Sequence, residues 1–392
     1  MRIVHVIETV DPQKGGTSAV PLRLAAAQAA LGYEVFVGAR DLHGYGESMA
    51  ESIAAVPQAS LIKFVSLPAG LRIGEAGRAL KRILERGDIL HLHGVWEPLL
   101  WLAAHTAKKN RANYVLTPHG MLDAWCLAHK RWKKKLALMA WVERMLSNSL
   151  FIHVLNDHET QQLGNLGFGC RLATIPNGVF FEEICYEEED RRGLAWSFPS
   201  LGSRPYILFL GRLNFKKGLD YLAAAFRRFA GRDDTTDLVI VGPDDGAKEA
   251  FVRQIAEYRL LNRVHILGPV NGIAKYALIK NATCFCLPSR QEGFSLAILE
   301  AMASGVPVVV TENCNFPEIS KIGAGKVVKL DAEVLCEALW EYVGSRELAR
   351  EAGNAGRKLV MSKYTWSMVA SQMVSAYRRA LHEEAVTGPA AV

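Results

Sequence analysis

The chain has 392 residues, which at roughly 100–200 residues per domain predicts two domains rather than one small module. Half of its residues are hydrophobic and 22% are charged, a composition that excludes disordered and collagen-like chains. Its 46 lysines and arginines against 40 acidic residues give a formal charge of +6, which is too small for a dedicated nucleic-acid-binding protein.

The seven cysteines form no C-x-x-C pair and no zinc-binding spacing. Their odd number predicts reduced thiols in a reducing compartment. The N-terminal apolar run ends at Glu8, which makes it too short for a signal peptide. The sequence contains no uninterrupted run of about 18 apolar residues, so it predicts no transmembrane helix. We therefore expect a cytoplasmic protein, either free or peripheral on the inner face of the plasma membrane.

Short β-rich runs alternate with longer helical patterns along the whole chain, as they do in βαβ units. In the first half, the expected strands are 2–7, 34–38, 61–65, 88–92, 113–117, 151–154 and 172–175. The expected helices there are 17–31, 71–86, 96–109, 131–147 and 157–166. Asn156 and Glu159 form a candidate capping box for the last of these helices.

A second series of strands and helices follows an aperiodic acidic stretch. Its expected strands are 206–211, 237–242, 264–267, 283–287 and 306–310, and its last three helices are 331–344, 347–362 and 366–382. The pattern predicts an α/β fold of two Rossmann-like, doubly wound domains facing each other across a cleft. We expect an N-terminal acceptor domain at 1–185, a linker at 186–204, a nucleotide-sugar donor domain at 205–365 and a C-terminal helix, 366–385, that packs back on the first domain.

The first segment that could bind a ligand joins the first strand to the first helix, over residues 8–18. Gly15 and Gly16 would let the backbone approach a ligand closely, and Thr17 or Ser18 would cap the helix, whose free N–H groups attract anions. The segment lacks the G-x-G-x-x-G dinucleotide fingerprint. Taken alone, it is equally compatible with a surface turn.

The second segment, residues 211–218, leaves the first strand of the second series and enters a helix. Arg212 and Lys217 lie in it, beside the expected helix N-terminus. Cations in this position can neutralise a diphosphate without a metal ion. The alternative is a pair of solvated loop cations.

The third segment follows the strand that ends at Leu287. Glu292 lies in the loop at the carboxyl end of the sheet, where open α/β sheets bind ligands. Glu300 lies about one and a half turns into the next helix, where a solvated side chain is the simpler interpretation. The backbone N–H groups of the residues that begin this helix offer a second anion site. These residues are Phe294, Ser295 and Leu296.

The three segments together resemble those of the family 4 glycosyltransferases, retaining enzymes of the GT-B fold. Glu292 and Glu300 match the family's E-x7-E motif, and Arg212 with Lys217 matches its G-R-x(n)-K-G loop. The segment 175–179 matches its I-P-N-G-V sequence. The resemblance spans nearly the whole chain. The sequence departs from the family at Val179-Phe180, where many members have Val-Asp, and in having Gly-Phe-Ser-Leu-Ala for Gly-Phe-Gly-Leu-Pro.

The resemblance implies a role for each matching residue. Arg212 and Lys217 would bind the donor diphosphate together with the amides at Phe294–Leu296, and Glu300 would accept hydrogen bonds from the ribose. Glu292 would contact the transferred sugar. His119, in a Thr-Pro-His-Gly-Met-Leu segment typical of members that build bacterial exopolysaccharide or lipopolysaccharide, would hold the sugar or assist transfer. The base-binding loop would contain Val270 and Asn271, and Gly15 and Gly16 would contribute to the donor site.

The expected reaction is metal-independent transfer with retention of configuration. Preorganised cations and helix N-termini can stabilise a departing diphosphate. No Asp-x-Asp stands at the end of a second-domain strand to bind Mg²⁺, and Asp244-Asp245 reads as a turn. Retaining hydrolases use a carboxylate nucleophile, but the family resemblance implies front-face attack assisted by the leaving phosphate. Glu292 is therefore not assigned as a covalent nucleophile.

A basic segment at 129–142 carries five lysines or arginines in six positions before an apolar run, with Trp132 among the cations and Trp141 in the run. It could rest on an anionic membrane surface or steer a lipid-diphosphate acceptor, or it could be a solvated helix face. The expected donor is a UDP-glucose-type sugar or GDP-mannose, and the expected acceptor is a glycan or a lipid-linked oligosaccharide. The alternatives are a non-catalytic, glycosyltransferase-like subunit and a Rossmann oxidoreductase, whose fingerprint is absent.

Overall fold

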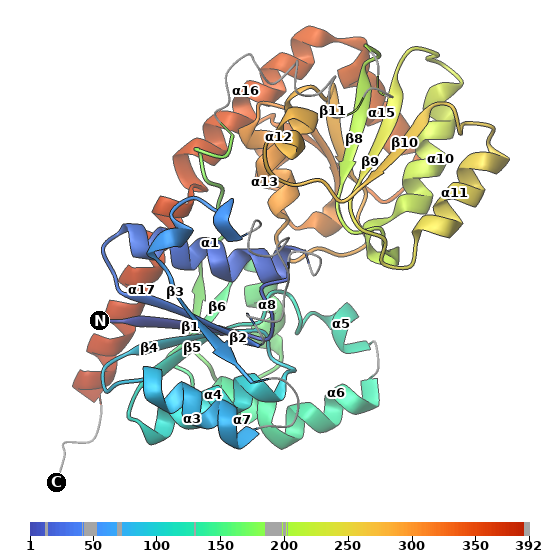
Figure 1. The fold of residues 1–392 in the computed structure, drawn as a ribbon. Coiled ribbons are helices and arrows are strands. Elements are labelled where there is room, and N and C mark those ends of the chain that lie inside the picture. The colour runs from blue at the N-terminus through green and yellow to red at the C-terminus, as the bar shows by residue number, and fades with distance from the viewer. Residues whose placement is uncertain are drawn as a thin grey trace. The chain divides into compact units, whose positions relative to one another are not determined.

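The computed structural model describes residues 1–11, 15–40, 42, 53–68, 73–128, 131–184, 198, 201 and 203–387. The chain divides into two compact units (Figure 1). Unit 1 comprises Met1–Asn177 and Trp366–Val392, and unit 2 comprises Gly178–Thr365. The boundary precedes the expected one at 185/186, because Val179 pairs with Thr365 and Ile184 belongs to the core of unit 2. Most of the expected linker, 186–204, lies outside the described residues.

Unit 1 is built on a seven-stranded parallel sheet in the order β3-β2-β1-β4-β5-β6-β7. Its strands are β1 Ile3–Ile7, β2 Val35–Arg40, β3 Lys63–Leu67, β4 Ile89–His93, β5 Asn113–Thr117, β6 Ile152–Val154 and β7 Leu172–Thr174. Every residue of β1 and β4 is buried, as expected for parallel strands that are covered on both faces. Each of the seven expected strands overlaps an observed one.

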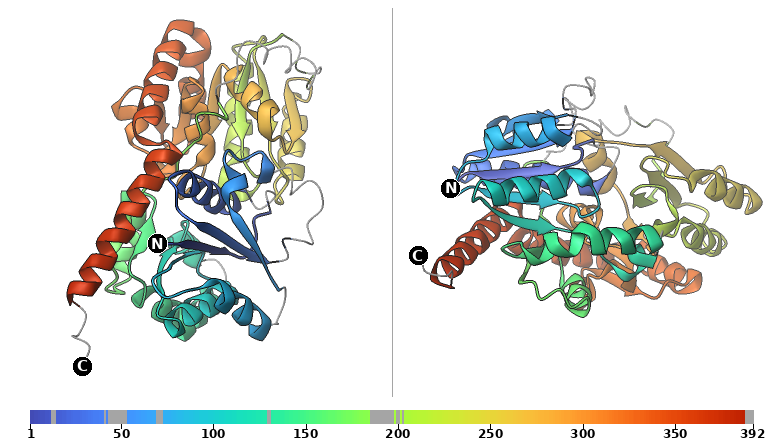
Figure 2. Two further views of the ribbon diagram at one scale, coloured as in Figure 1. Left: turned by 60° about the vertical axis from the view of Figure 1, so that its left-hand side comes forward. Right: turned by 90° about the horizontal axis from the view of Figure 1, so that it is seen from below.

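Helices cover both faces of this sheet. They are α1 Gly16–Ala30, α3 Ile73–Ile83, α4 Pro98–Lys109, α5 Ala124–Ala128, α6 Arg131–Ala137, α7 Glu143–Ser147, α8 Asp157–Asn165 and α17 Trp366–Thr387. Helix α17 packs against α1 on one face, whereas α3 and α4 pack together on the other (Figures 1 and 2). The C-terminal helix thus belongs to the first unit although it follows the second in sequence.

Two local expectations for unit 1 are wrong. Helix α1 begins at Gly16 and its N-cap is Gly15, because the Ser18 hydroxyl donates to the carbonyl oxygen of Asp11 instead of capping the helix. The single helix expected at 131–147 is interrupted by a π-helical turn at Leu138–Val142. The Asn156 cap is confirmed, because its Oδ1 accepts a hydrogen bond from the Glu159 N–H at 2.9 Å.

Unit 2 contains a six-stranded parallel sheet in the order β10-β9-β8-β11-β12-β13. Its strands are β8 Tyr206–Leu210, β9 Asp237–Val241, β10 Val264–Gly268, β11 Cys284–Leu287, β12 Val308–Thr311 and β13 Gly325–Val328. The edge strand β13 was not expected. It has only four residues and begins with a glycine and a lysine, which do not indicate a strand.

The helices of unit 2 are α10 Leu219–Ala230, α11 Lys248–Glu257, α12 Gly272–Lys280, α13 Leu296–Ala303, α14 Glu318–Lys321, α15 Ala332–Gly344 and α16 Arg346–Lys363. Figure 1 shows α10 and α11 on one side of the sheet and α12 and α13 on the other. Helix α10 packs against α11 and α15, and α13 packs against α12 and α16. This is the doubly wound arrangement that the sequence predicts.

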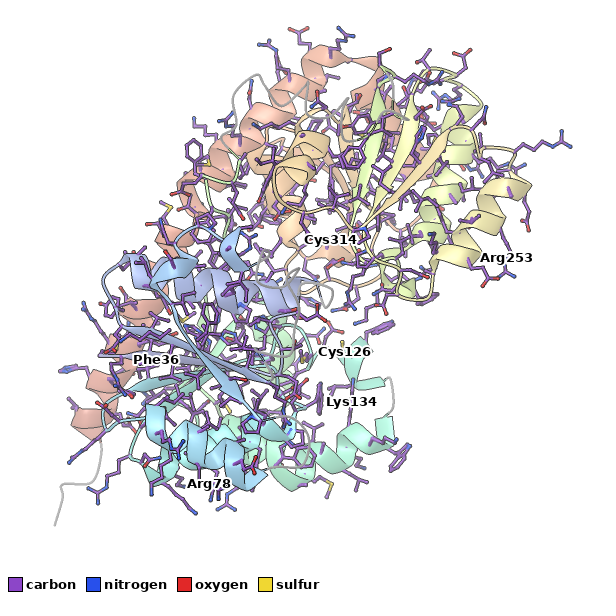
Figure 3. The ribbon with its side chains drawn as sticks, viewed as in Figure 1. Phe36, Arg78, Cys126, Lys134, Arg253 and Cys314 are labelled. Atoms are coloured by element: carbon purple, nitrogen blue, oxygen red, sulfur yellow. The ribbon has the colours of Figure 1, made fainter. Side chains whose placement is uncertain are left out.

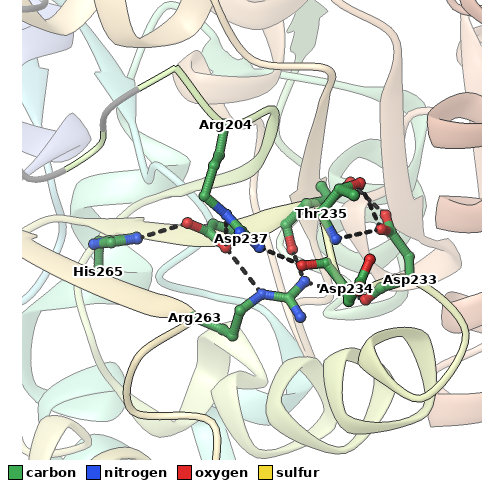
Figure 4. A network of polar contacts seen from close by, with 8 residues as sticks. Arg204, Asp233, Asp234, Thr235, Asp237, Arg263 and His265 are labelled. Carbon is green, nitrogen blue, oxygen red and sulfur yellow. Dashed lines mark hydrogen bonds and ion pairs between the residues drawn. The ribbon is translucent and has the colours of Figure 1, made fainter.

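An ion cluster joins the amino ends of three neighbouring strands in unit 2 (Figure 4). The buried Asp237 carboxylate accepts hydrogen bonds from Arg204 Nε at 3.0 Å and from Arg263 Nε at 2.9 Å. His265 Nε2 lies 3.0 Å from its other oxygen. Arg204 precedes β8, whereas Arg263 and His265 belong to β10 or its approach, so the Asp237 carboxylate on β9 ties both neighbouring strands together at this end of the sheet.

Candidate functional site

The two ligand-binding segments expected in the second half of the chain leave adjacent strands of unit 2. Residues 211–218 follow β8, and residues 288–295 follow β11. These strands are neighbours, and the chain turns to opposite sides of the sheet after them, so they form its topological switch point. Open α/β sheets bind ligands at the carboxyl ends of the strands at this point.

The two loops are in direct contact because of a glycine. Gly218 has φ +67°, and a Cβ at this position would lie 2.0 Å from the Pro288 carbonyl oxygen. No other residue could bring the loops so close without moving the backbone. The Arg290 N–H donates to the Lys216 carbonyl oxygen at 2.6 Å, which fixes the register of one loop against the other.

The pair at the centre of these loops is Lys217 and Glu292. Lys217 Nζ lies 2.5 Å from Glu292 Oε1, and the Ser289 hydroxyl donates to the same oxygen at 2.6 Å. The side chains are 17% and 10% exposed, so the pair is largely removed from water. The loops thus place an ammonium group and a carboxylate together, each held by the other, at the edge of the sheet.

Arg212 has a different partner in the same loop region. Its Nη1 donates to Asp245 Oδ2 at 2.8 Å, and Asn214 Nδ2 donates to that oxygen at 3.0 Å. Asp244 uses Oδ1 to accept the N–H groups of Gly246 and Lys248. Asp244 therefore forms the expected turn, whereas Asp245 is an anionic partner of the expected diphosphate-binding arginine.

Glu300 lies on the side of α13 that faces α12. Its Oε1 lies 2.8 Å from Lys275 Nζ and 3.5 Å from the Tyr276 hydroxyl. Glu300 is buried, so the simpler interpretation of a solvated helical carboxylate is wrong. The same helix α12 follows the expected base-binding loop, in which Asn271 is the N-cap residue and Val270 packs against the core of unit 2.

The first turn of α13 lies directly beyond Glu292. Ser295 is the N-cap residue of α13, and its side chain makes no capping hydrogen bond. Leu296 is the first helical residue, and the Phe294 ring packs against Phe316 at a centroid distance of 5.1 Å. The aromatic contact fixes where the helix begins, so the helix N-terminus is held close to the Lys217–Glu292 pair.

The remaining expected site residues belong to unit 1. Gly15, with φ +78°, precedes α1, and Gly16 begins that helix. His119 follows β5 and has φ +53°, a left-handed backbone conformation that is uncommon for residues other than glycine. The Gly120 N–H donates to Glu159 Oε1 at 2.7 Å, and the Leu155 N–H donates to Glu159 Oε2 at 2.8 Å. Glu159 thus holds the turn that presents His119.

Five histidines form a cluster in unit 1, with His5 on β1, His91 and His93 on β4, His119 after β5 and His153 on β6. All but His119 are buried, and His119 keeps part of its surface exposed. Burial lowers the pKa of His119 to about 3, and it lowers the pKa of His5 and of His153 to about 4. The cluster is therefore uncharged at neutral pH.

The sequence did not indicate several groups that contact the expected site residues. They are Asp245, Ser289, Lys275, Glu159 and His93. Ser289 lies two residues after a strand, and His93 alternates with His91 within another strand, so Ser289 and His93 carried a usable signal. The other contacts join elements that are distant in sequence, and no local pattern marks them.

The basic segment lies on unit 1 and exposes apolar side chains. Trp132, Leu136 and Met139 are 65%, 59% and 71% exposed, and their spacing places them along one side of the helix. Lys134 is turned inward instead, and its Nζ donates to the Cys126 carbonyl oxygen at 2.5 Å (Figure 3). His129 and Lys130 lie outside the described residues. Among the helices that the structure describes, none has the length and hydropathy needed to span a membrane.

Comparison with known proteins gives a consistent result for the two halves of the chain. The model of the glycosyl transferases group 1 matches residues 191–359, and that of the glycosyl transferase 4-like domain matches residues 15–178. The phosphatidyl-myo-inositol mannosyltransferase of Mycobacterium leprae is 28% identical over 391 residues, which cover 96% of this chain and 96% of that protein.

Solved structures show the same fold. Sucrose-phosphate synthase of Thermosynechococcus elongatus superposes with a TM-score of 0.77 at 21% identity, covering 98% of this chain and 100% of that structure. Anabaena Alr3699/HepE in complex with UDP-glucose superposes with a TM-score of 0.78 at 15% identity, covering 97% and 100%. The expected fold of two Rossmann-like domains, known as GT-B, is confirmed.

Proposed function

Because the chain belongs to the group 1 glycosyltransferases of family 4 type, we propose that it transfers a hexosyl group from a nucleotide sugar to a glycan or a lipid-linked acceptor. In this proposal the transfer retains the anomeric configuration and needs no metal ion. The observation that carries it is the arrangement of Lys217, Glu292 and the N-terminus of α13 at the switch point of unit 2.

The donor diphosphate would bind to Lys217, to Arg212 and to the N–H groups at the start of α13. A departing nucleoside diphosphate gains negative charge, and a fixed ammonium group, a guanidinium group and a helix N-terminus stabilise that charge. In the structure, Arg212 is paired with Asp245 and Lys217 with Glu292. Binding of a diphosphate would therefore exchange carboxylate partners for phosphate oxygens, and it would free Glu292 to accept hydrogen bonds from the sugar hydroxyls.

The nucleoside would lie beside α12. Glu300 offers carboxylate oxygens to the ribose hydroxyls, and the loop with Val270 and Asn271 would lie against the base. Lys275 orients the Glu300 carboxylate through an ion pair of 2.8 Å, and the two side chains are only 13% and 9% exposed. In unit 1, Gly15 and Gly16 would meet the donor and His119 the transferred sugar.

The relatives support a hexosyl donor and a lipid or glycan acceptor. The Mycobacterium leprae protein is named for mannose and a phosphatidyl lipid. The Anabaena structure holds UDP-glucose. We propose a UDP-glucose-type donor or GDP-mannose and a role in building a bacterial cell-surface polysaccharide.

A membrane surface is the proposed location of the acceptor. The exposed stripe of Trp132, Leu136 and Met139 is flanked by the exposed lysines Lys133 and Lys135. Such a face can insert apolar side chains between lipids while its cations meet anionic headgroups. Replacing the three apolar residues of the stripe by serine should abolish sedimentation with vesicles of anionic phospholipid. Leu261→Ser, at a residue in unit 2 that is 60% exposed, is the matched control, and equal sedimentation of all variants would contradict this location.

The reaction itself is tested with the purified chain and a panel of UDP-, GDP- and ADP-sugars in the absence of acceptor. We expect slow release of nucleoside diphosphate from one donor, unchanged by EDTA, and a higher melting temperature with the matching nucleoside diphosphate. Loss of turnover in EDTA would contradict metal independence. The absence of both turnover and thermal shift with every donor would favour the non-catalytic subunit instead.

A further inference from the structure

A continuous chain of hydrogen bonds runs through the interior of unit 1 and ends at His119. The chain begins at the Ile175 carbonyl oxygen and links nine groups in the order Ile175, His153, Thr117, His91, Tyr377, Gln28, His5, His93 and His119. The eight links are 2.6–3.3 Å long. The proposed donor-binding role of His119 does not explain why its ring is connected to the far side of the sheet.

The first group fixes the direction of every bond. A backbone carbonyl oxygen only accepts, so His153 donates through Nε2–H at 2.7 Å. A neutral His153 then has an unprotonated Nδ1, and the Thr117 hydroxyl must donate to it. Thr117 has one proton, so its oxygen accepts from His91 Nε2–H at 2.6 Å.

The same reasoning continues through the next three groups. His91 Nδ1 is unprotonated and accepts from the Tyr377 hydroxyl at 2.6 Å. The tyrosine oxygen then accepts from Gln28 Nε2 at 3.3 Å, which fixes the orientation of the Gln28 amide. Gln28 Oε1 consequently accepts from His5 Nε2–H at 2.7 Å.

The last two bonds reach the site. His5 Nδ1 accepts from His93 Nε2–H at 2.8 Å, and His93 Nδ1 accepts from His119 Nε2–H at 3.1 Å. All five histidines are therefore in the same Nε2–H tautomer. His119 is left with an unprotonated Nδ1, to which no group in the described part of the chain donates a hydrogen bond.

These bond directions hold for neutral imidazole rings, and the surroundings of the cluster keep the rings neutral. The rings lie 4.3–5.7 Å apart, so a charge on one would repel a charge on the next. Their hydrogen-bond partners among the described residues are hydroxyls, an amide, a carbonyl and one another, and none is a carboxylate. His5, His91 and His93 are close enough together to suggest a metal site, but hydrogen bonds already use both nitrogens of each ring.

We propose that this histidine relay fixes the tautomer of His119, so that Nδ1 presents a lone pair and accepts a hydrogen bond from a sugar hydroxyl. Thr117, Tyr377, Gln28 and His93 are positioning residues that act through His119. The relay is not a proton exit, because its far end is a carbonyl oxygen that cannot take a proton. The tautomer follows from unit 1 alone, and only the identity of the hydroxyl rests on the proposed function.

The test removes one link that is far from His119 and measures the tautomer directly. Tyr377→Phe takes away the hydroxyl that orients Gln28, so the amide is free to turn and the relay to reverse. Tyr114→Phe is the matched control, because Tyr114 is also buried in unit 1 and its hydroxyl donates to the Met145 carbonyl oxygen outside the relay. Protein labelled with ¹⁵N-histidine reports the protonation of each ring nitrogen, and the His119 signals are assigned by their loss in His119→Gln.

We expect His119 of the unaltered chain to be protonated at Nε2 alone at neutral pH, and Tyr114→Phe to leave this unchanged. Tyr377→Phe should populate the Nδ1–H form and lower kcat about tenfold, a loss equivalent to one hydrogen bond. The thermal shift with nucleoside diphosphate should remain. An Nδ1–H or doubly protonated His119 in the unaltered chain, an unchanged tautomer in Tyr377→Phe, or uptake of one zinc ion by His5, His91 and His93 would overturn the proposal.

A second pair of variants covers the case in which Tyr377→Phe does not fold. Thr117→Val breaks the relay at the other side of His91 and should have the same effect on the His119 signals, whereas Thr117→Ser keeps the hydroxyl and should restore them. Identical signals in the two variants would overturn the proposal. If no nucleotide sugar is turned over, the proposed function fails while the tautomer measurement still decides the relay.

Discussion

The two units carry their polar residues in opposite ways. Unit 2 gathers charges at its switch point and holds several of them in ion pairs, as in Lys217 with Glu292, Lys275 with Glu300 and Arg212 with Asp245. Unit 1 gathers imidazoles in one cluster on its sheet and keeps them neutral. Unit 2 is thus suited to bind an anion, and unit 1 is suited to orient hydroxyl groups without adding charge.

The largest expected effect on activity comes from a substitution in unit 2, the charged half. Lys217→Ala removes the ammonium group from the proposed diphosphate site and leaves the Glu292 carboxylate to repel phosphate. We expect kcat to fall roughly 10²–10³-fold, as when one preorganised donor to developing charge is lost. The thermal shift with nucleoside diphosphate should also disappear.

The adjacent Lys216 provides the control for this variant. Its Nζ donates to the Gln291 side-chain oxygen at 3.0 Å. Lys216→Ala should therefore retain most of the activity. Equal losses in the two variants would show that the charge of the loop, and not the position of Lys217, determines turnover.

The stability of unit 1, the neutral half, should depend on pH. Burial depresses the pKa of His5 and His153 to about 4 and of His119 to about 3, below the ordinary value of 6.5. As the pH falls below 6.5, the histidines of the unfolded chain bind protons whereas those of the folded cluster do not. The contribution of the neutral cluster to folding stability is therefore fully present above pH 6.5 and is lost as the pH falls toward 4.

We expect the melting temperature to fall by roughly 5–10 °C between pH 7 and pH 5, a loss of a few kcal/mol in a chain of this size. Burial also raises the pKa of the Glu97 and Glu159 carboxyls, which acts in the opposite direction but concerns two groups against five. A melting temperature that is flat or rises over this range would contradict the neutral cluster.

The third prediction sharpens the contrast between buried and exposed charge pairs. Lys275→Met leaves the buried Glu300 carboxylate without its cation and should destabilise the chain by about 3 kcal/mol in urea unfolding. Adding Glu300→Gln should recover most of this loss. Arg253, labelled in Figure 3, forms an exposed pair with Glu249, and Arg253→Ala should cost at most about 0.5 kcal/mol. A similar cost for both single variants would mean that the Lys275–Glu300 pair is solvated.

The smallest effect concerns the turn that presents His119. Glu159 accepts the N–H groups of Gly120 and Leu155, one on each oxygen. Glu159→Gln sets an amide NH₂ group against one of these donors and should destabilise the chain by about 2 kcal/mol. Glu159→Gln should lower kcat more than the partly exposed control Gln162→Glu, and equal activity of the two variants would show that Glu159 does not position His119.

Much of the fold could be predicted because parallel strands buried on both faces are continuous apolar runs, as in Tyr206–Leu210. Strand β13 could not be, because four residues beginning with Gly325 carry too little signal. Lys217 and Glu292 could be identified because each lies in a loop after an expected strand and matches a motif of the family. Their partners depend on tertiary contacts. The relay is the extreme case, since Gln28 and Tyr377 are 349 positions apart in sequence.

The most direct test of the central claim is a crystal structure of the chain with the nucleoside diphosphate that raises its melting temperature. The account predicts the diphosphate at the switch point of unit 2, with Lys217 Nζ and Arg212 on its oxygens and the ribose on Glu300. A nucleotide bound elsewhere, or bound there through a divalent ion with Lys217 still paired to Glu292, would contradict it.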